Sequence, residues 1–188
     1  ETPKIVEQKI ININNHKYKK LIIDVRDNSG GGFDQAISVT DLFLPKNSII
    51  ASTKSRDGKV EQYKARKGLL NSDIQVIVLT NKDTFCGAEL FTAALRESRK
   101  VKIVGETTFG KWNAQTVEIL PNKYAIKYTV KEFQSPNGNS YQGTGIKPDV
   151  EVSLPHGVSS DILRSKYEPK KRLDIDTQLK AAIELIKS

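Results

Sequence analysis

The chain of 188 residues contains one cysteine, two histidines and no methionine. A single cysteine excludes a disulfide within the chain and a metal site built from thiolates. Two histidines are too few for a histidine-rich metal site, and a Ser-His-Asp triad would have to use His16 or His156. His16 lies in a polar connector and His156 in a Leu-Pro-His-Gly turn, so we expect both at the surface.

Long hydrophobic runs are also missing. Runs such as Val76 to Leu79 are far shorter than the roughly 20 residues that a membrane-spanning helix needs. No charged-then-apolar leader opens the chain, and we expect no transmembrane segment in it. Because the chain opens on Glu1 and not on methionine, we expect a mature form or a fragment of a longer protein.

The net charge of +8 at pH 7 raises the question of a nucleic-acid partner. The basic residues are dispersed, and the densest stretch, Arg164 to Arg172, is interrupted by Glu168 and Pro169. Aromatic residues do not alternate with basic ones as they do on surfaces that stack bases. We therefore expect no nucleic-acid partner and a solvated surface that is attracted, at most, to anionic cell envelopes.

Strand patterns alternate with helix patterns along the chain. The apolar runs Leu21–Val25 and Ile74–Leu79 predict buried strands, and Phe33–Leu44 and Cys86–Ser98 have the periodicity of helices. Gln115–Phe133 mostly alternates between polar and apolar residues, which predicts antiparallel strands. The expected class is therefore α/β with antiparallel additions.

Two glycine-containing corners invite a chemical interpretation. The first ends in Gly30-Gly31-Gly32 and is either a plain turn that needs positive φ or a place where backbone N–H groups approach an oxyanion. The second, residues 105–111, nearly completes a phosphate-binding loop. However, Trp112 stands where that loop requires Ser or Thr, and a strand pattern follows in place of a helix. We therefore reject nucleotide binding.

A third corner contains Cys86, between the strongest strand pattern and a helix. At a helix N-terminus, unpaired N–H groups and the helix dipole favour a thiolate. A lone cysteine is nevertheless usually a small buried hydrophobic residue, and position alone favours that structural interpretation.

Several segments match motifs of one known family. Leu21–Gly31 reads Leu-Ile-Ile-Asp-Val-Arg-Asp-Asn-Ser-Gly-Gly, and Asp41–Pro45 reads Asp-Leu-Phe-Leu-Pro. Val104–Lys111 reads Val-Gly-Glu-Thr-Thr-Phe-Gly-Lys, Gln115 follows it, and Gly143–Asp149 reads Gly-Thr-Gly-Ile-Lys-Pro-Asp. In this order, and over nearly the whole chain, they resemble the carboxyl-terminal processing peptidases (tail-specific proteases, peptidase family S41).

The resemblance implies a nucleophile–lysine dyad of the kind found in serine-type peptidases. Cys86 falls at the position of the family's nucleophilic serine, three residues before Glu89 and 25 residues before Lys111. Lys111 matches the general base, and Gln115 matches the glutamine that in many members orients this lysine.

The resemblance also implies an oxyanion hole. Gly30 and Gly31 match the glycine pair that supplies one donor, and the amide of Gly87 matches the other. A lysine can act as a base only when neutral, which burial favours. Phe109 and Trp112 flank the lysine and either form an apolar wall for it or are ordinary core or surface aromatics.

The sequence departs from the family at the nucleophile, which is a thiol in place of a hydroxyl. Because a thiol ionises more readily, a Cys86–Lys111 pair could rest as thiolate and ammonium. Three explanations stay open: a natural cysteine nucleophile, an engineered Ser→Cys change, or a natural member that no longer cleaves.

For the fold, the resemblance implies a ClpP/crotonase-like spiral of ββα units, with helices packed on a mixed sheet. Residues 1–188 would form a single peptidase core ending in a helix at about 174–187. The PDZ domain that the family usually carries has no room before Leu21, so we expect none in this chain.

The implied substrates are unstructured C-terminal tails of proteins, added as a strand beside the site. The resemblance implies no cofactor or metal and a location outside the cytoplasm, in the periplasm, the cell envelope or the secreted fraction. A homo-oligomer stays open. The alternative is an inactive member that binds a peptide or an apolar ligand, as interphotoreceptor retinoid-binding proteins do on a similar fold. The set of Lys111, Gln115 and glycines favours the peptidase.

Overall fold

The computed structural model describes residues 1–121 and 123–187. The strands are β1 (Lys20–Asp24), β2 (Ile49–Ser55), β3 (Val60–Lys64), β4 (Gln75–Thr80), β5 (Lys102–Gly105), β6 (Asn113–Ile119), β7 (Ala125–Gln134) and β8 (Val150–Glu151). The helices are α1 (Thr2–Asn15), α2 (Phe33–Asp41), α3 (Gly87–Arg99), α4 (Ser160–Lys166), α5 (Pro169–Ile175) and α6 (Thr177–Lys187). No helix within the described ranges is both long and apolar enough to span a bilayer.

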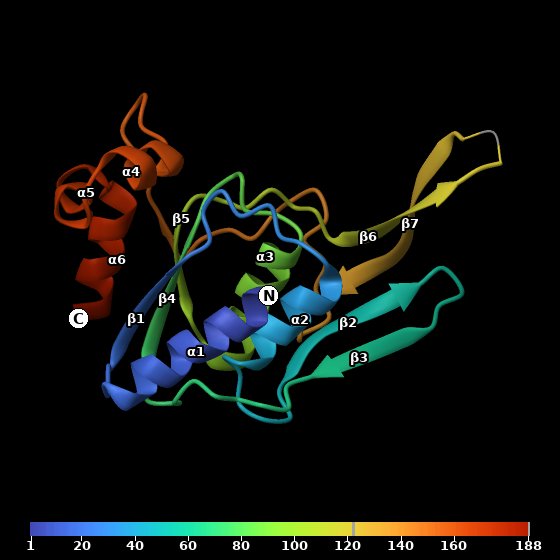
Figure 1. Cartoon of the computed structure of the whole chain (residues 1–188), viewed down its shortest axis with the longest axis horizontal. Helices are drawn as coiled ribbons and strands as arrows, with labels where there is room; N and C mark the ends of the chain where they lie inside the picture. The colour runs from blue at the N-terminus through green and yellow to red at the C-terminus, as the bar shows by residue number, and fades with distance from the viewer. Residues whose placement is uncertain (122, 188) are drawn as a thin grey trace.

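A parallel sheet, in the order β1-β4-β5-β8, is covered by helices on both faces. Because side chains alternate along a strand, Val76 and Val78 of β4 pack in the cluster that includes residues of α1 and α3. Ile77 and Leu79 point the other way and pack against α6. Figure 1 shows α6 on one side of this sheet and α1, α2 and α3 on the other. Burial on both faces explains why the strand reads as one continuous apolar run, and the predicted strand is confirmed.

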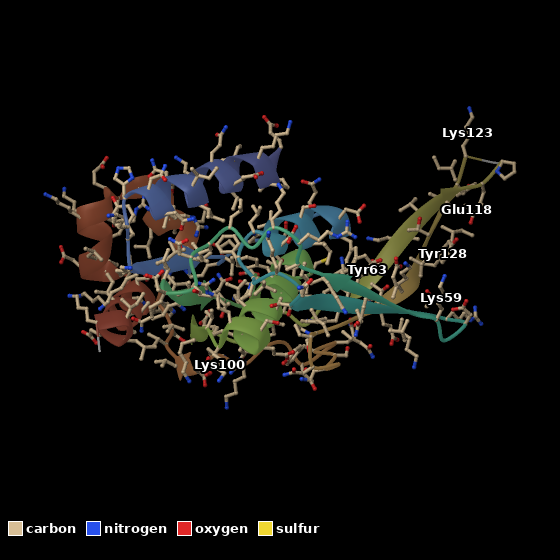
Figure 2. The ribbon with its side chains drawn as sticks, turned by 90° about the horizontal axis from the view of Figure 1, so that it is seen from below. Lys59, Tyr63, Lys100, Glu118, Lys123 and Tyr128 are labelled. Carbon is tan, nitrogen blue, oxygen red and sulfur yellow. The ribbon has the colours of Figure 1, made fainter. Side chains whose placement is uncertain are left out.

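An antiparallel sheet, in the order β3-β2-β7-β6, consists of two hairpins that extend away from the helices (Figure 1). Its base is anchored in the core, where the Phe133 ring stacks on the Phe33 ring with centroids 5.0 Å apart. Its outer part is open to solvent: Ile119 is 78% exposed, and Figure 2 shows Glu118 and Tyr128 on the part of the β6–β7 hairpin that projects from the body. The α/β class with antiparallel additions is confirmed, and the two strand types form separate sheets.

The C-terminal region contains more helix than the sequence pattern indicated. The helices α4 and α5 are each seven residues long and overlap the basic stretch, where apolar residues are too sparse for a clear helical period. Ser159 caps α4 by accepting a hydrogen bond from the Ile162 amide at 3.2 Å. The last helix begins at Thr177, a little later than the predicted start near 174, because Asp176 Oδ1 accepts the Leu179 amide at 2.9 Å and caps it.

Burial predicts how two isoleucines in strands differ in their contribution to stability. Ile103 in β5 is 0% exposed and Ile119 in β6 is 78% exposed. We expect Ile103→Ala to lower the free energy of unfolding by about 2–5 kcal/mol, because it leaves a cavity. The matched Ile119→Ala change should cost at most about 0.5 kcal/mol. Urea unfolding followed by circular dichroism measures both, and equal losses would contradict this account of the core.

Candidate active site

Cys86 lies on a sharp corner between β4 and α3. Its backbone has φ 57° and ψ −120°, a conformation that costs a non-glycine residue about 1–3 kcal/mol, so its surroundings have to hold it. Several hydrogen bonds do this: Thr84 Oγ1 donates to the Val25 carbonyl at 2.8 Å, and the Phe85 amide donates to the Asn28 carbonyl at 3.1 Å. The thiol is half-buried at the N-terminus of α3, where the sequence placed it.

The carboxylate of Glu89 connects this corner to the segment that carries the lysine. Glu89 is 0% exposed. Its Oε1 accepts hydrogen bonds from Thr108 Oγ1 at 2.6 Å and from the Gly110 amide at 2.7 Å. Its Oε2 accepts the Cys86 amide at 3.0 Å and the Lys111 amide at 2.8 Å. One carboxylate oxygen therefore holds the backbones of both predicted dyad residues.

This role of Glu89 was not predicted from the sequence, where the residue served only to mark the position of Cys86 three residues before it. The signal that could have found it is the spacing of Glu89 from Cys86. A glutamate at the third helical position commonly turns back to the amide of the N-cap residue.

The amine of Lys111 lies against the residue that precedes the cysteine. Lys111 Nζ is 5.9 Å from the centroid of the Phe85 ring, and this ring in turn lies 5.5 Å from the Phe109 ring. Aromatic faces attract ammonium groups at such distances. Of the two flanking aromatics, Phe109 is 61% exposed and Trp112 is buried in the core. Phe85, which the sequence analysis did not single out, is the aromatic surface under the amine.

The glycine corner meets the cysteine corner backbone to backbone. Gly30 has φ 83°, and a Cβ there would lie 2.6 Å from the Gly87 nitrogen and 2.8 Å from the Phe85 carbonyl oxygen, so no other residue fits. The Gly30 amide donates to Asn28 Oδ1 at 2.9 Å. Within the described part of the chain, the amides of Gly31 and Gly87 donate no hydrogen bond. Two unpaired N–H groups are therefore available where the corners meet.

A cavity of about 340 Å³ opens beside these glycines. Gly31 and Gly87 line it, together with apolar side chains from β1, α1, α2 and α3 that include Ile23, Val39 and Phe91. A cavity that is lined mostly by apolar residues, with a few polar ones among them, is typical of a site that takes an apolar group.

The remaining candidate residues lie outside this corner. Gln115 is exposed on β6, and no hydrogen bond among the described residues joins it to Lys111, so its orienting role stays a prediction. His16 and His156 are both exposed. Among the described residues, no group of three or more His, Cys, Asp or Glu side chains is placed to hold a metal ion.

Comparison with known proteins identifies a matching family. Residues 1–152 match the model of Peptidase family S41. A carboxy-terminal-processing protease of Bartonella bacilliformis is 37% identical over 139 residues, which are 74% of this chain and 32% of that protein. The chain thus spans about a third (32%) of the length of the curated relatives that it matches first.

Solved structures show the same fold. The photosystem II D1 C-terminal processing protease has a TM-score of 0.74 and 29% identity, over 82% of this chain and 40% of that one. Mature CPAF has a TM-score of 0.71 at 14% identity, over 100% of this chain and 48% of that one, a likeness that concerns the fold alone. With the family model matched over most of its length, the chain belongs to peptidase family S41.

Proposed function

We propose that this chain is the catalytic core of a C-terminal processing peptidase in which Cys86 is the nucleophile and Lys111 the general base. One observation carries the proposal: the buried Glu89 carboxylate binds the amides of both residues through a single oxygen. A carboxylate with this many donors is strongly held, so the two segments keep a fixed relation. The family of the chain supports a peptidase, and the name of its Bartonella relative supports processing at C-termini.

In the proposed reaction, the Cys86 thiol transfers its proton to the Lys111 amine, or rests already as the thiolate. Sγ attacks the carbonyl carbon of the scissile peptide, and the amides of Gly31 and Gly87 bind the oxyanion that forms. Lys111 then gives its proton to the leaving amine as the C–N bond breaks. Water, deprotonated by the same lysine, hydrolyses the thioester and releases the acid product.

Gly30 and Gln115 have supporting roles in this proposal. Gly30 lets the two corners approach closely, because any side chain there would collide with the Gly87 nitrogen. Its own amide is engaged by Asn28, so the donor from the glycine pair is assigned to Gly31. Gln115, which is exposed on β6, keeps the proposed role of orienting Lys111.

The proposed substrates are unstructured protein tails with an apolar residue beside the scissile bond. The cavity next to Gly31 and Gly87 has the size and the lining for such a side chain. The proposed location is outside the cytoplasm.

The first test concerns the two residues of the dyad. We expect the chain to cleave an unfolded test protein, and Cys86→Ala and Lys111→Ala to lower the rate at least about a thousandfold with unchanged circular dichroism spectra. Undiminished cleavage by Lys111→Ala would refute the assigned base. Cleavage by Cys86→Ser alone would identify a serine-peptidase scaffold that the thiol disables. If folded protein and all variants were inactive, the ligand-binding alternative would be favoured.

The second test concerns Glu89. An amide in place of this carboxylate presents its NH₂ group to donors, so Glu89→Gln should lower the free energy of unfolding by about 2–3 kcal/mol. It should also lower kcat by more than about tenfold, because the dyad segments lose their common anchor.

A matched control lies on the same helix. The carboxylate of Glu97 binds the Asn137 amide at 2.7 Å and the Tyr141 hydroxyl at 3.0 Å, and neither partner is a residue of the dyad. We expect Glu97→Gln to lower stability with kcat unchanged. If the two variants lowered kcat equally, the special role of Glu89 would be wrong.

A further inference from the structure

Residues 25–31, here called the oxyanion loop, follow β1 and end in the glycines of the site. Few backbone hydrogen bonds hold this loop: the Val25 amide donates to the Leu79 carbonyl at 3.0 Å, the Asn28 amide donates to the Val25 carbonyl at 3.3 Å, and the Asn28 carbonyl accepts the Phe85 amide. The position of the Gly31 amide therefore depends on side chains, and two successive residues, Arg26 and Asp27, make contacts with the C-terminal helices.

Arg26 is only 5% exposed, and its buried positive charge is fully paired. Its guanidinium binds Asp24 in a bidentate manner at 2.9 and 2.8 Å and Asp176 in the same manner at 3.0 and 2.8 Å. Gln178 Oε1 accepts the fifth N–H at 2.9 Å. Because an unpaired buried charge costs several kcal/mol, Arg26 keeps this position only while the start of α6 is docked.

Asp27 has φ 57°, a backbone conformation that its side-chain partners stabilise. Its carboxylate accepts hydrogen bonds from Arg164 Nη2 at 2.5 Å, from Asn81 Nδ2 at 2.6 Å and from the Ser160 hydroxyl. Partial burial raises the pKa of the Asp27 carboxyl, but these hydrogen bonds and the Arg164 charge together hold it below its usual range. Asn81 belongs to the corner that leads to Cys86, so Asp27 joins the C-terminal helices to both corners of the site.

We propose that the C-terminal segment from Ser160 to Gln178 positions the oxyanion loop for catalysis, through Asp176 on Arg26 and through Arg164 and Ser160 on Asp27. The catalytic part of this inference rests on the function proposed above. The path from the helices to the donor is short: Asn28, the next residue, accepts the Gly30 amide with its side chain. Figure 1 shows α4 near the end of the parallel sheet where β1 leads into this loop.

A merely structural role would predict something different. If these contacts only fastened the C-terminal helices, losing one would lower stability and leave the turnover of folded enzyme unchanged. A positioning role predicts a selective loss of kcat with KM retained, because the oxyanion donor acts on the transition state and not on the bound ground state.

Arg164 is the residue to change, because its side chain is 36% exposed. Its partner Asp27, whose side chain is 27% exposed, stays in contact with solvent when Arg164 is replaced. We expect Arg164→Gln to lower kcat by about 10- to 100-fold, less than the loss of a complete oxyanion donor, with KM within about twofold. Arg164→Lys, which keeps a cation beside Asp27, should recover most of this loss. Ser160→Ala is the second variant and should act in the same direction.

Arg96→Gln is the matched control. The Arg96 side chain is 30% exposed and pairs with Asp149 at 3.4 Å. The Arg96→Gln variant therefore loses a comparable ion pair, at a place that does not touch the oxyanion loop. We expect its kcat to equal that of the parent chain.

Hydrogen exchange measures the loop without any reference to activity. In peptides that cover residues 27–32, amide exchange should be at least about tenfold faster in Arg164→Gln than in the parent and in Arg96→Gln, with β4 unchanged. Unchanged exchange in these peptides would overturn the proposal, as would faster exchange accompanied by an unchanged kcat. If the parent chain cleaves nothing, the proposed function fails, and exchange alone still decides whether the helices hold the loop.

Discussion

The buried carboxylate of Glu89 is the interaction on which the site depends. Removing a carboxylate from water costs several kcal/mol unless donors replace the water. Four donors replace it here, and they come from the first turn of α3 and from residues 108–111. One of them, Thr108, in turn accepts the Ile146 amide at 2.7 Å. Cys86 and Lys111 are therefore brought together by folding itself, and so is the glycine-rich segment that follows β7.

Local patterns were sufficient to predict most of the fold. Val76–Leu79 reads as a buried strand because both faces of its sheet are covered, and α3 has the periodic apolar pattern of a helix. What could not be predicted depends on distant partners. Nothing near Arg26 indicates that Asp176, 150 residues away, completes its pairing. The helices α4 and α5 are too short for a periodic signal.

The candidate site was predicted in the same uneven way. Family motifs located Cys86, Lys111 and the glycines, whereas position alone favoured an ordinary buried cysteine. The positive φ of Cys86 is compatible with the proposed nucleophile, although Lys17, Asn47 and Lys100 have positive φ as well. Strain of this kind is set by hydrogen bonds to neighbouring loops, which no local sequence pattern reports. The aromatic partner of Lys111, Phe85, was missed for the same reason.

Two buried charged groups flank the site, the Glu89 carboxylate and the Arg26 guanidinium. Burying a charge costs free energy, and this cost indicates that the two groups contribute more than stability. Apolar residues of similar volume often stabilise a protein as well as a buried ion pair does, so stability alone explains neither Glu89 nor Arg26. Directional bonds fix positions in a way that apolar packing does not. β1 and β4 are adjacent parallel strands that end at the same level, with Asp24 opposite Leu79, so their loops emerge side by side. Glu89 fixes the loop after β4 and Arg26 fixes the loop after β1, and the two unpaired amides lie between them.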